Sequence, residues 1–118
     1  MLVSMACSAQ TTYTGGYAAC MDQSNGVTSN MLACIGEELE KQDARLNSAY
    51  RTLTSQLNAE RKQQLVAAQR LWIQYRDANC QFYADPEGGT LATLSANQCV
   101  LDETSQRASE LEILGAEY

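Results

Sequence analysis

Five cysteines in a chain of 118 residues constrain the fold more than any other feature of this sequence. None belongs to a Cys-x-x-Cys pair, which argues against a zinc knuckle and a thioredoxin-type redox motif. Small domains use disulfides in oxidising compartments, so we expect a periplasmic or secreted protein. Reduced, buried thiols in a cytosolic protein are the alternative. The cysteines are Cys7, Cys20, Cys34, Cys80 and Cys99.

The last four cysteines can form two disulfides in three different ways. We favour Cys20–Cys34 and Cys80–Cys99, because each pair closes a short loop of the chain. Closing a loop of this size stabilises a folded protein by about 3 kcal/mol in the chain-entropy model. The second pair would also join two consecutive helices beside a Gly-Gly turn.

The chain contains no histidine. This excludes Ser-His and Cys-His catalysis and also His-ligated zinc. Sites made only of carboxylates or cysteines are still open, but no motif indicates one. We therefore expect no metal and no cofactor, and interpret the protein as a binding protein rather than an enzyme.

The formal net charge of −6 points to the class of partner. Phosphate groups need clustered Lys and Arg, so nucleic acid is a poor partner, whereas a basic protein is favoured. Residues 83–118 carry seven acidic residues and one Arg, so the last third holds most of the negative charge. A solvated surface that aids solubility is the simpler interpretation of this charge.

The N-terminal part divides into two segments. Residues 1–9 resemble the end of a signal peptide, and a lipid anchor at Cys7 is the weaker alternative because no leucine stands three positions before it. Residues 10–28 are rich in Thr, Gly, Ser and Asn, so we expect an irregular segment pinned by Cys20. No apolar stretch is long enough to span a membrane.

Residues 29–118 predict an all-α domain, an antiparallel three-helix bundle with two disulfides. A first helix begins near Ser29, and only Asp43 interrupts its apolar stripe. Asn58 is the expected N-cap of a second helix, which ends before residues 85–89. The third helix is expected over 93–114, with Gly115 as its stop. The expected inner faces are Leu32, Ile35, Leu39, Leu46, Tyr50, Leu53 and Leu57; Leu65, Ala68, Trp72, Tyr75, Asn79 and Phe82; and Leu94, Leu101, Ala108 and Leu111.

Trp72 and Arg76 share one face of the second helix, where the Arg needs a partner to be buried at low cost. Asp43 is the obvious candidate, supported by Asn47 or Thr104. We expect a polar clamp between helices that fixes their register. An anion-binding site at Arg76 is the alternative.

Two features could bind or transform a ligand. The carboxylate pairs Glu37-Glu38 and Asp102-Glu103 are interpreted as solvated, because adjacent side chains on a helix diverge by about 100°. The turn after the second helix has no phosphate-loop pattern. It is either a plain turn or a partner-contacting loop, formed by Asp85, Glu87, Gly88, Gly89 and Thr90.

The chain from Cys20 to Leu114 resembles the LprI-type lysozyme-inhibitor family, small secreted or lipid-anchored bacterial domains. The resemblance lies in the cysteines and in three motifs: Asp43-x-x-Leu46-Asn47-x-x-Tyr50, Ala68-Gln69-Arg70-x-Trp72-x-x-Tyr75-Arg76-Asp77-x-x-Cys80, and Thr104-x-x-Arg107-x-x-x-Leu111. Gly88-Gly89-Thr90 belongs to the same pattern. The spacer between Cys20 and Cys34 is longer than the family pattern implies.

The resemblance implies an all-helical extracytoplasmic domain that inhibits a lysozyme-type muramidase. The acidic turn from Asp85 to Thr90 is the surface that we expect to bind such a basic partner. An envelope interaction or structural module without lysozyme inhibition is the alternative function, and a small hydrolase using carboxylates is a third.

Overall fold

The computed structural model describes residues 11–117, which form four α-helices and no strand. The helices are α1 (Gly15–Gln23), α2 (Thr28–Ser55), α3 (Ala59–Tyr83) and α4 (Gly89–Ala116). Disulfides join Cys20 to Cys34 and Cys80 to Cys99. The predicted all-helical class and both disulfides are therefore confirmed. The expected signal-peptide remnant at 1–9 and the alternative lipid anchor at Cys7 lie outside the described residues.

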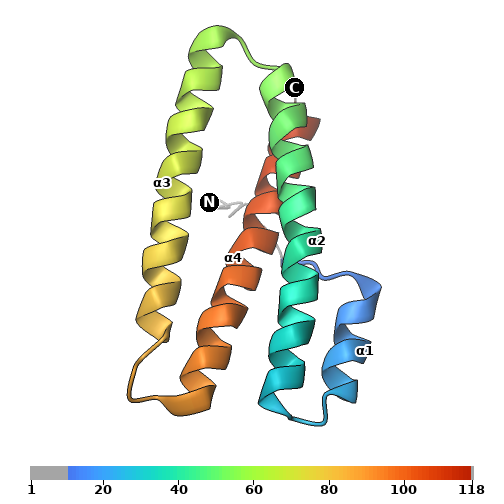
Figure 1. Ribbon diagram of the computed structural model, residues 1–118. Coiled ribbons are helices and arrows are strands. Elements are labelled where there is room, and N and C mark those ends of the chain that lie inside the picture. Colours follow the sequence, from blue (N-terminus) through green and yellow to red (C-terminus); the bar gives the residue numbers. More distant parts are fainter. Residues whose placement is uncertain (1–10, 118) are drawn as a thin grey trace, which may run out of the picture.

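The three long helices alternate in direction, so α2 and α4 run parallel to each other (Figure 1). α4 packs most extensively on α2, and α3 packs on α4 rather than on α2. The short α1 runs antiparallel to the first half of α2. None of the helices within 11–117 combines the length and the apolarity that crossing a membrane requires.

The expectation of three helices after an irregular segment was wrong in one respect, because α1 lies within residues 10–28. Gly15 and Gly16 are poor helix formers, so local propensity gave no signal for this helix. Its position is fixed instead by the Cys20–Cys34 bond. The chain reverses after it at Asn25 and Gly26, both with positive φ.

The helix ends were predicted with mixed success. Asn58 caps α3 as expected, since its side-chain oxygen accepts a hydrogen bond from Arg61 N at 2.9 Å. α4 begins at Gly89, four residues before the expected start, so Gly89 and Thr90 belong to its first turn. Gly115 does not stop α4, which continues to Ala116.

The apolar core lies between α2 and α4. Leu46, Ala49 and Leu53 of α2 pack on Ala108 and Leu111 of α4, the last two fully buried. From α3, Leu65 and Trp72 pack against this cluster, as their places on the predicted inner face require.

α3 is covered on one side only, and Cys80 is its single fully buried residue. Tyr75 and Phe82 were expected to face inward, but 58% and 82% of their surfaces are exposed. Together with the exposed Leu71 they form an apolar row at helical spacing on the solvent-exposed surface of α3, which we call the outer stripe of α3. The prediction failed because nothing in the sequence indicates which of two apolar faces finds a neighbour.

Since α3 has so little burial of its own, we expect the Cys80–Cys99 bond to hold its end on α4. Replacing both cysteines by Ala should lower the free energy of unfolding by about 3 kcal/mol in chemical denaturation. In hydrogen exchange, α3 amides should exchange faster while those of the α2–α4 contact remain protected. Uniform loss of protection in α2, α3 and α4 would contradict this arrangement.

Candidate functional site

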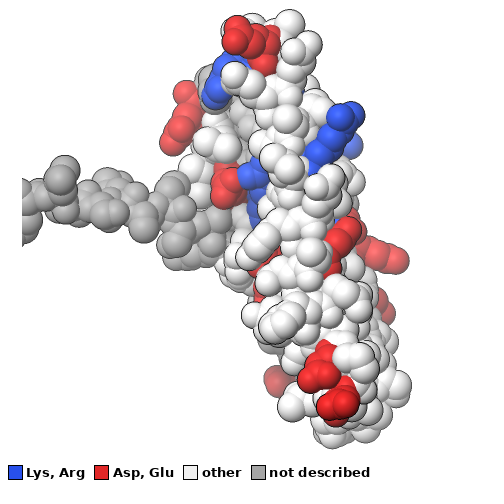
Figure 2. Space-filling model, turned by 90° about the vertical axis from the view of Figure 1, so that its left-hand side faces the viewer, with Lys and Arg blue, Asp and Glu red and all other residues white. Residues whose placement is uncertain are grey.

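One end of the bundle carries carboxylates but no Lys or Arg. It comprises residues 11–40 and 77–106, which are α1, the start of α2, the end of α3 and the first half of α4. Figure 2 shows red and white surface at this lower end, with blue only farther up. We call it the acidic end; its carboxylates belong to Asp22, Glu37, Glu38, Glu40, Asp77, Asp85, Glu87, Asp102 and Glu103.

The turn between α3 and α4 projects from the acidic end and is held by its own hydrogen bonds. Asp85 accepts one from Glu87 N at its carboxylate (2.9 Å) and one from Gly88 N at its carbonyl (3.0 Å). A Cβ at position 88 would lie 2.6 Å from the Ala92 Cβ, and Gly89 has φ +63°. Both glycines are therefore required by the geometry of the turn.

Exposed apolar side chains flank this turn. Phe82 is 82% exposed and Leu91 is 72% exposed, one on each side of the acidic residues. Exposed aromatic residues beside charges are typical of protein-binding surfaces. This surface was not predicted, because Phe82 was expected on the inner face of the second helix and Leu91 belonged to no predicted site. We call Phe82, Asp85, Glu87 and Leu91 the tip.

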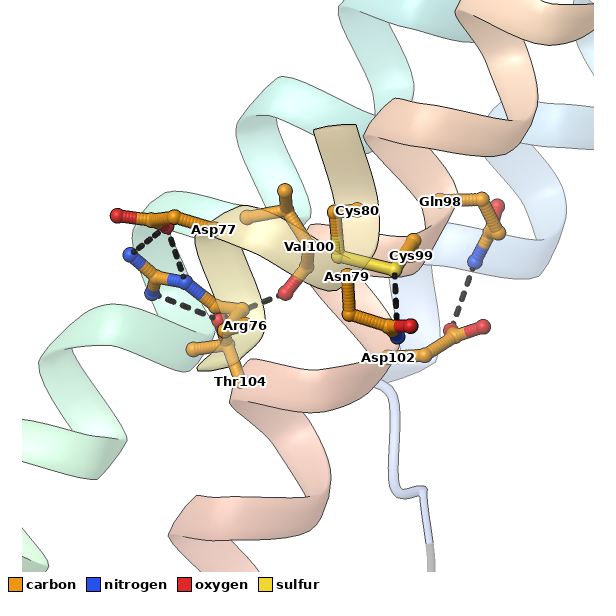
Figure 3. The surroundings of a disulfide bond; sticks show 9 residues. All are labelled: Arg76, Asp77, Asn79, Cys80, Gln98, Cys99, Val100, Asp102 and Thr104. Atoms are coloured by element: carbon orange, nitrogen blue, oxygen red, sulfur yellow. Dashed lines mark hydrogen bonds and ion pairs between the residues drawn. A yellow bond between two sulfur atoms is a disulfide. The ribbon is translucent and has the colours of Figure 1, made fainter. Parts of the chain in front are cut away.

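The Cys80–Cys99 bond holds together the two helices that carry the tip. It joins the last turns of α3 to α4 with a Cα–Cα distance of 5.4 Å. Figure 3 shows the bond between two polar groups, with Arg76, Asp77 and Thr104 on one side and Gln98 and Asp102 on the other. The two helix ends from which the tip projects are therefore covalently linked.

The expected clamp at Arg76 is only partly present. Arg76 lies over the Trp72 ring, with 5.1 Å between the guanidinium carbon and the ring centroid, and bonds Thr104 Oγ1 at 3.4 Å. Its ion pair is with Asp77, at 3.0 Å, and not with Asp43. Burial raises the pKa of Asp43 and the charge of Arg76 lowers it less, so the net pKa is raised. Asn47 is exposed on α2.

The extensive clamp between α2 and α4 is instead made by Arg45. Its guanidinium forms an ion pair of 2.5 Å with Glu112 and donates to Ser109 Oγ at 2.7 Å and to Gln42 Oε1 at 2.9 Å. Sequence reasoning missed it. The available signal was the spacing of polar residues three and four apart beside the apolar stripe.

Glu38 was interpreted as solvated, but only 2% of its surface is exposed. Its carboxylate accepts hydrogen bonds from Thr14 N (2.7 Å), from the Thr14 hydroxyl and from Gln42 Nε2 (2.9 Å). Burial alone would raise the pKa of Glu38, but these bonds outweigh it and the pKa is lowered. Gln42 and Ser105 also bind the backbone of Thr12. The segment 11–14 is thereby fastened across α2 and α4.

Asp102, from the other carboxylate pair, is also engaged. It accepts hydrogen bonds from the Tyr13 hydroxyl and from Gln98 Nε2, the latter at 2.9 Å. Burial and the neighbouring carboxylate raise the pKa of Tyr13, so its hydroxyl stays protonated. Within residues 11–117, no group of three or more Cys, Asp or Glu is placed to hold a metal ion.

Comparison with known proteins agrees with the cysteine and Trp-Arg pattern. The family model "Lysozyme inhibitor LprI" matches residues 20–111. An uncharacterized protein of Rhizobium meliloti (strain 1021) is 28% identical over an alignment of 95 residues, and the match covers 69% of this chain and 68% of that protein. No solved structure matches the chain.

Removing the charge of Glu38 should destabilise the protein. In Glu38→Gln the amide would present a donor to groups that already donate, which costs about 1–3 kcal/mol of unfolding free energy at pH 7. The native pKa is lowered, so this stability is present above the unfolded value near 4.5 and lost as pH falls through the native pKa. Urea denaturation at several pH values measures it. The exposed neighbour, as Glu37→Gln, should change little; equal effects would contradict the assignment.

Asp43→Asn should raise the melting temperature at pH 7, although a clamp at this position would require the opposite. The native pKa of Asp43 is raised above 3.8, so its charge disfavours the folded state above that pH. Below pH 3.8 both states are protonated, and the difference between variant and parent should vanish. Thermal unfolding at pH 3 and pH 7 tests this. A clear loss of stability of Asp43→Asn at pH 7 would instead indicate that Asp43 forms the expected ion pair with Arg76.

Proposed function

The chain belongs to the LprI lysozyme-inhibitor family, and we propose that it is a secreted or periplasmic protein that inhibits lysozyme-type muramidases by binding them. The observation that carries the proposal is the tip. It combines exposed apolar and acidic side chains on a turn held by a disulfide, at an end of the bundle without Lys or Arg.

Charge explains how such a partner would be selected. Many muramidases of this type are basic, and an acidic surface attracts a basic one over about 8 Å at physiological ionic strength. Asp85 and Glu87 are exposed and lie in the turn itself, beside the exposed Phe82 and Leu91. Salt should therefore slow the association of the two proteins.

The apolar residues of the tip explain how the complex would be stabilised once it has formed. Phe82 has the most exposed side chain among the large apolar residues of the described chain, and an aromatic side chain that fills a pocket is a typical binding hot spot. Because the turn is held by its own hydrogen bonds and by the adjacent disulfide, it would lose little conformational entropy on binding. The tip would enter the substrate cleft of the enzyme and block it.

The double variant Phe82→Ala, Glu87→Lys should inhibit a basic lysozyme at least about tenfold less well, because it removes the apolar anchor and reverses a charge. A turbidity assay of cell-wall lysis at low salt measures the concentration for half inhibition. Glu117→Lys makes the same charge change beyond the other end of α4 and is the matched control.

Two outcomes would count against this function. If micromolar protein at low salt does not slow lysis, the chain is not an inhibitor of that enzyme. If Glu117→Lys weakens inhibition as much as the double variant does, general charge and not the tip carries the effect.

The outer stripe of α3 favours a second function, an envelope interaction or structural module. Leu71 and Tyr75 of this stripe are 64% and 58% exposed. A partner from the envelope that is not a muramidase would be captured by the parent protein and lost with Leu71→Ser, Tyr75→Ser. Lysis would then be unaffected by the parent and by the variant.

A further inference from the structure

A groove lies beside the tip, between the end of α3 on one side and α1 and the start of α2 on the other, with α4 beneath it. Its volume is about 530 Å³, within the range of small-ligand sites. Its floor is one face of α4 from Leu94 to Gln106, which is about 18 Å long at 1.5 Å per residue. Tyr83 of α3 forms one wall, and Met21 and Met31 of α1 and α2 form the other.

The groove changes in character along its length. Near the turn it is apolar, lined by Met21, Met31, Tyr83 and Leu94. Methionine side chains adapt to varied apolar partners, which is why they recur at binding surfaces for diverse peptides. A ligand for this half would present aliphatic or aromatic side chains.

The far half of the groove is acidic. Asp102 and Glu103 line it, and neither residues 11–40 nor residues 77–106 contain a Lys or Arg. In Figure 3, Asp102 lies on the same side of the disulfide as Gln98, where the Gln98 amide binds it. The Glu103 carboxylate has no hydrogen-bond or ion-pair partner in the described part of the chain. A cationic side chain is the complementary ligand here.

We propose that this groove binds short cationic amphipathic peptides. An apolar half followed by an acidic half, over about three helical turns, matches one face of a helix of about 12 residues. Aliphatic side chains of the peptide would contact Met21, Met31 and Leu94, and a Lys or Arg one or two turns along would reach Glu103. This activity is separate from muramidase inhibition and does not rest on it.

The probe is a synthetic helical peptide of about 14 residues, in which one face carries Leu in its first half and Lys in its second half, and the other face carries uncharged polar side chains. Isothermal titration at low salt should show saturable one-to-one binding. A peptide with Glu in place of every Lys, and a scrambled peptide of the same composition, should bind at least about tenfold more weakly. In amide NMR spectra, peptide-dependent shifts should concentrate at residues 94–106 and around Met21 and Met31.

Glu103→Lys should weaken binding of the peptide about tenfold, whereas Glu117→Lys should change it less than about twofold. Near-UV circular dichroism checks that Glu103→Lys is folded, and Leu94→Asp, a second groove variant, should also weaken binding. Phe82→Ala should keep peptide affinity within about twofold, which separates this site from the tip. The proposal is overturned by equal loss in the two Lys variants, by equal binding of the Glu peptide, by shifts centred on the outer stripe of α3, or by no saturable binding.

Discussion

The packing of α2 against α4 is the interaction on which the rest of the structure depends. Leu46, Ala49 and Leu53 meet Ala108 and Leu111 in one half of the contact, and Arg45 ties Gln42, Ser109 and Glu112 together beside it. Burial of apolar surface supplies the free energy, while the polar half fixes the register because each buried donor and acceptor needs its partner. The segment 11–14 and helix α3 are then fastened to this pair from opposite sides.

Segment 11–14 with α1, and helix α3, are attached to the α2–α4 pair by different interactions, and this difference determines which surfaces are exposed. Segment 11–14 and α1 are held by buried polar groups and by Cys20–Cys34. α3 is held by Leu65, Trp72 and Cys80–Cys99, which leaves its outer face bare. A helix covered on one side necessarily exposes its second apolar row. The bundle therefore presents a disulfide-braced acidic tip, an acidic and apolar groove and an apolar stripe on a small scaffold.

Features with a local cause could be predicted from the sequence. Asn58 caps α3 and the disulfides join cysteines close in sequence, because a cap and a short loop need only nearby residues. Burial depends on which element covers a face, and there the predictions failed. Glu38 and Gln42 continue the buried stripe of α2 as polar residues, and the segment that satisfies them is remote in sequence. The acidic turn was recognised, whereas the exposure of Phe82 and Leu91 was not, since it requires knowledge of how α3 lies on α4.

The central claim is that the disulfide-braced acidic end is the surface that meets a protein partner. Hydrogen–deuterium exchange of the protein alone and in complex with a basic lysozyme tests it most directly, because it maps contact without altering the chain. We expect new protection over residues 80–99 and unchanged exchange over residues 51–66, at the other end of the bundle. Protection confined to 51–66, or to the outer face of α3 around Leu71, would contradict the claim.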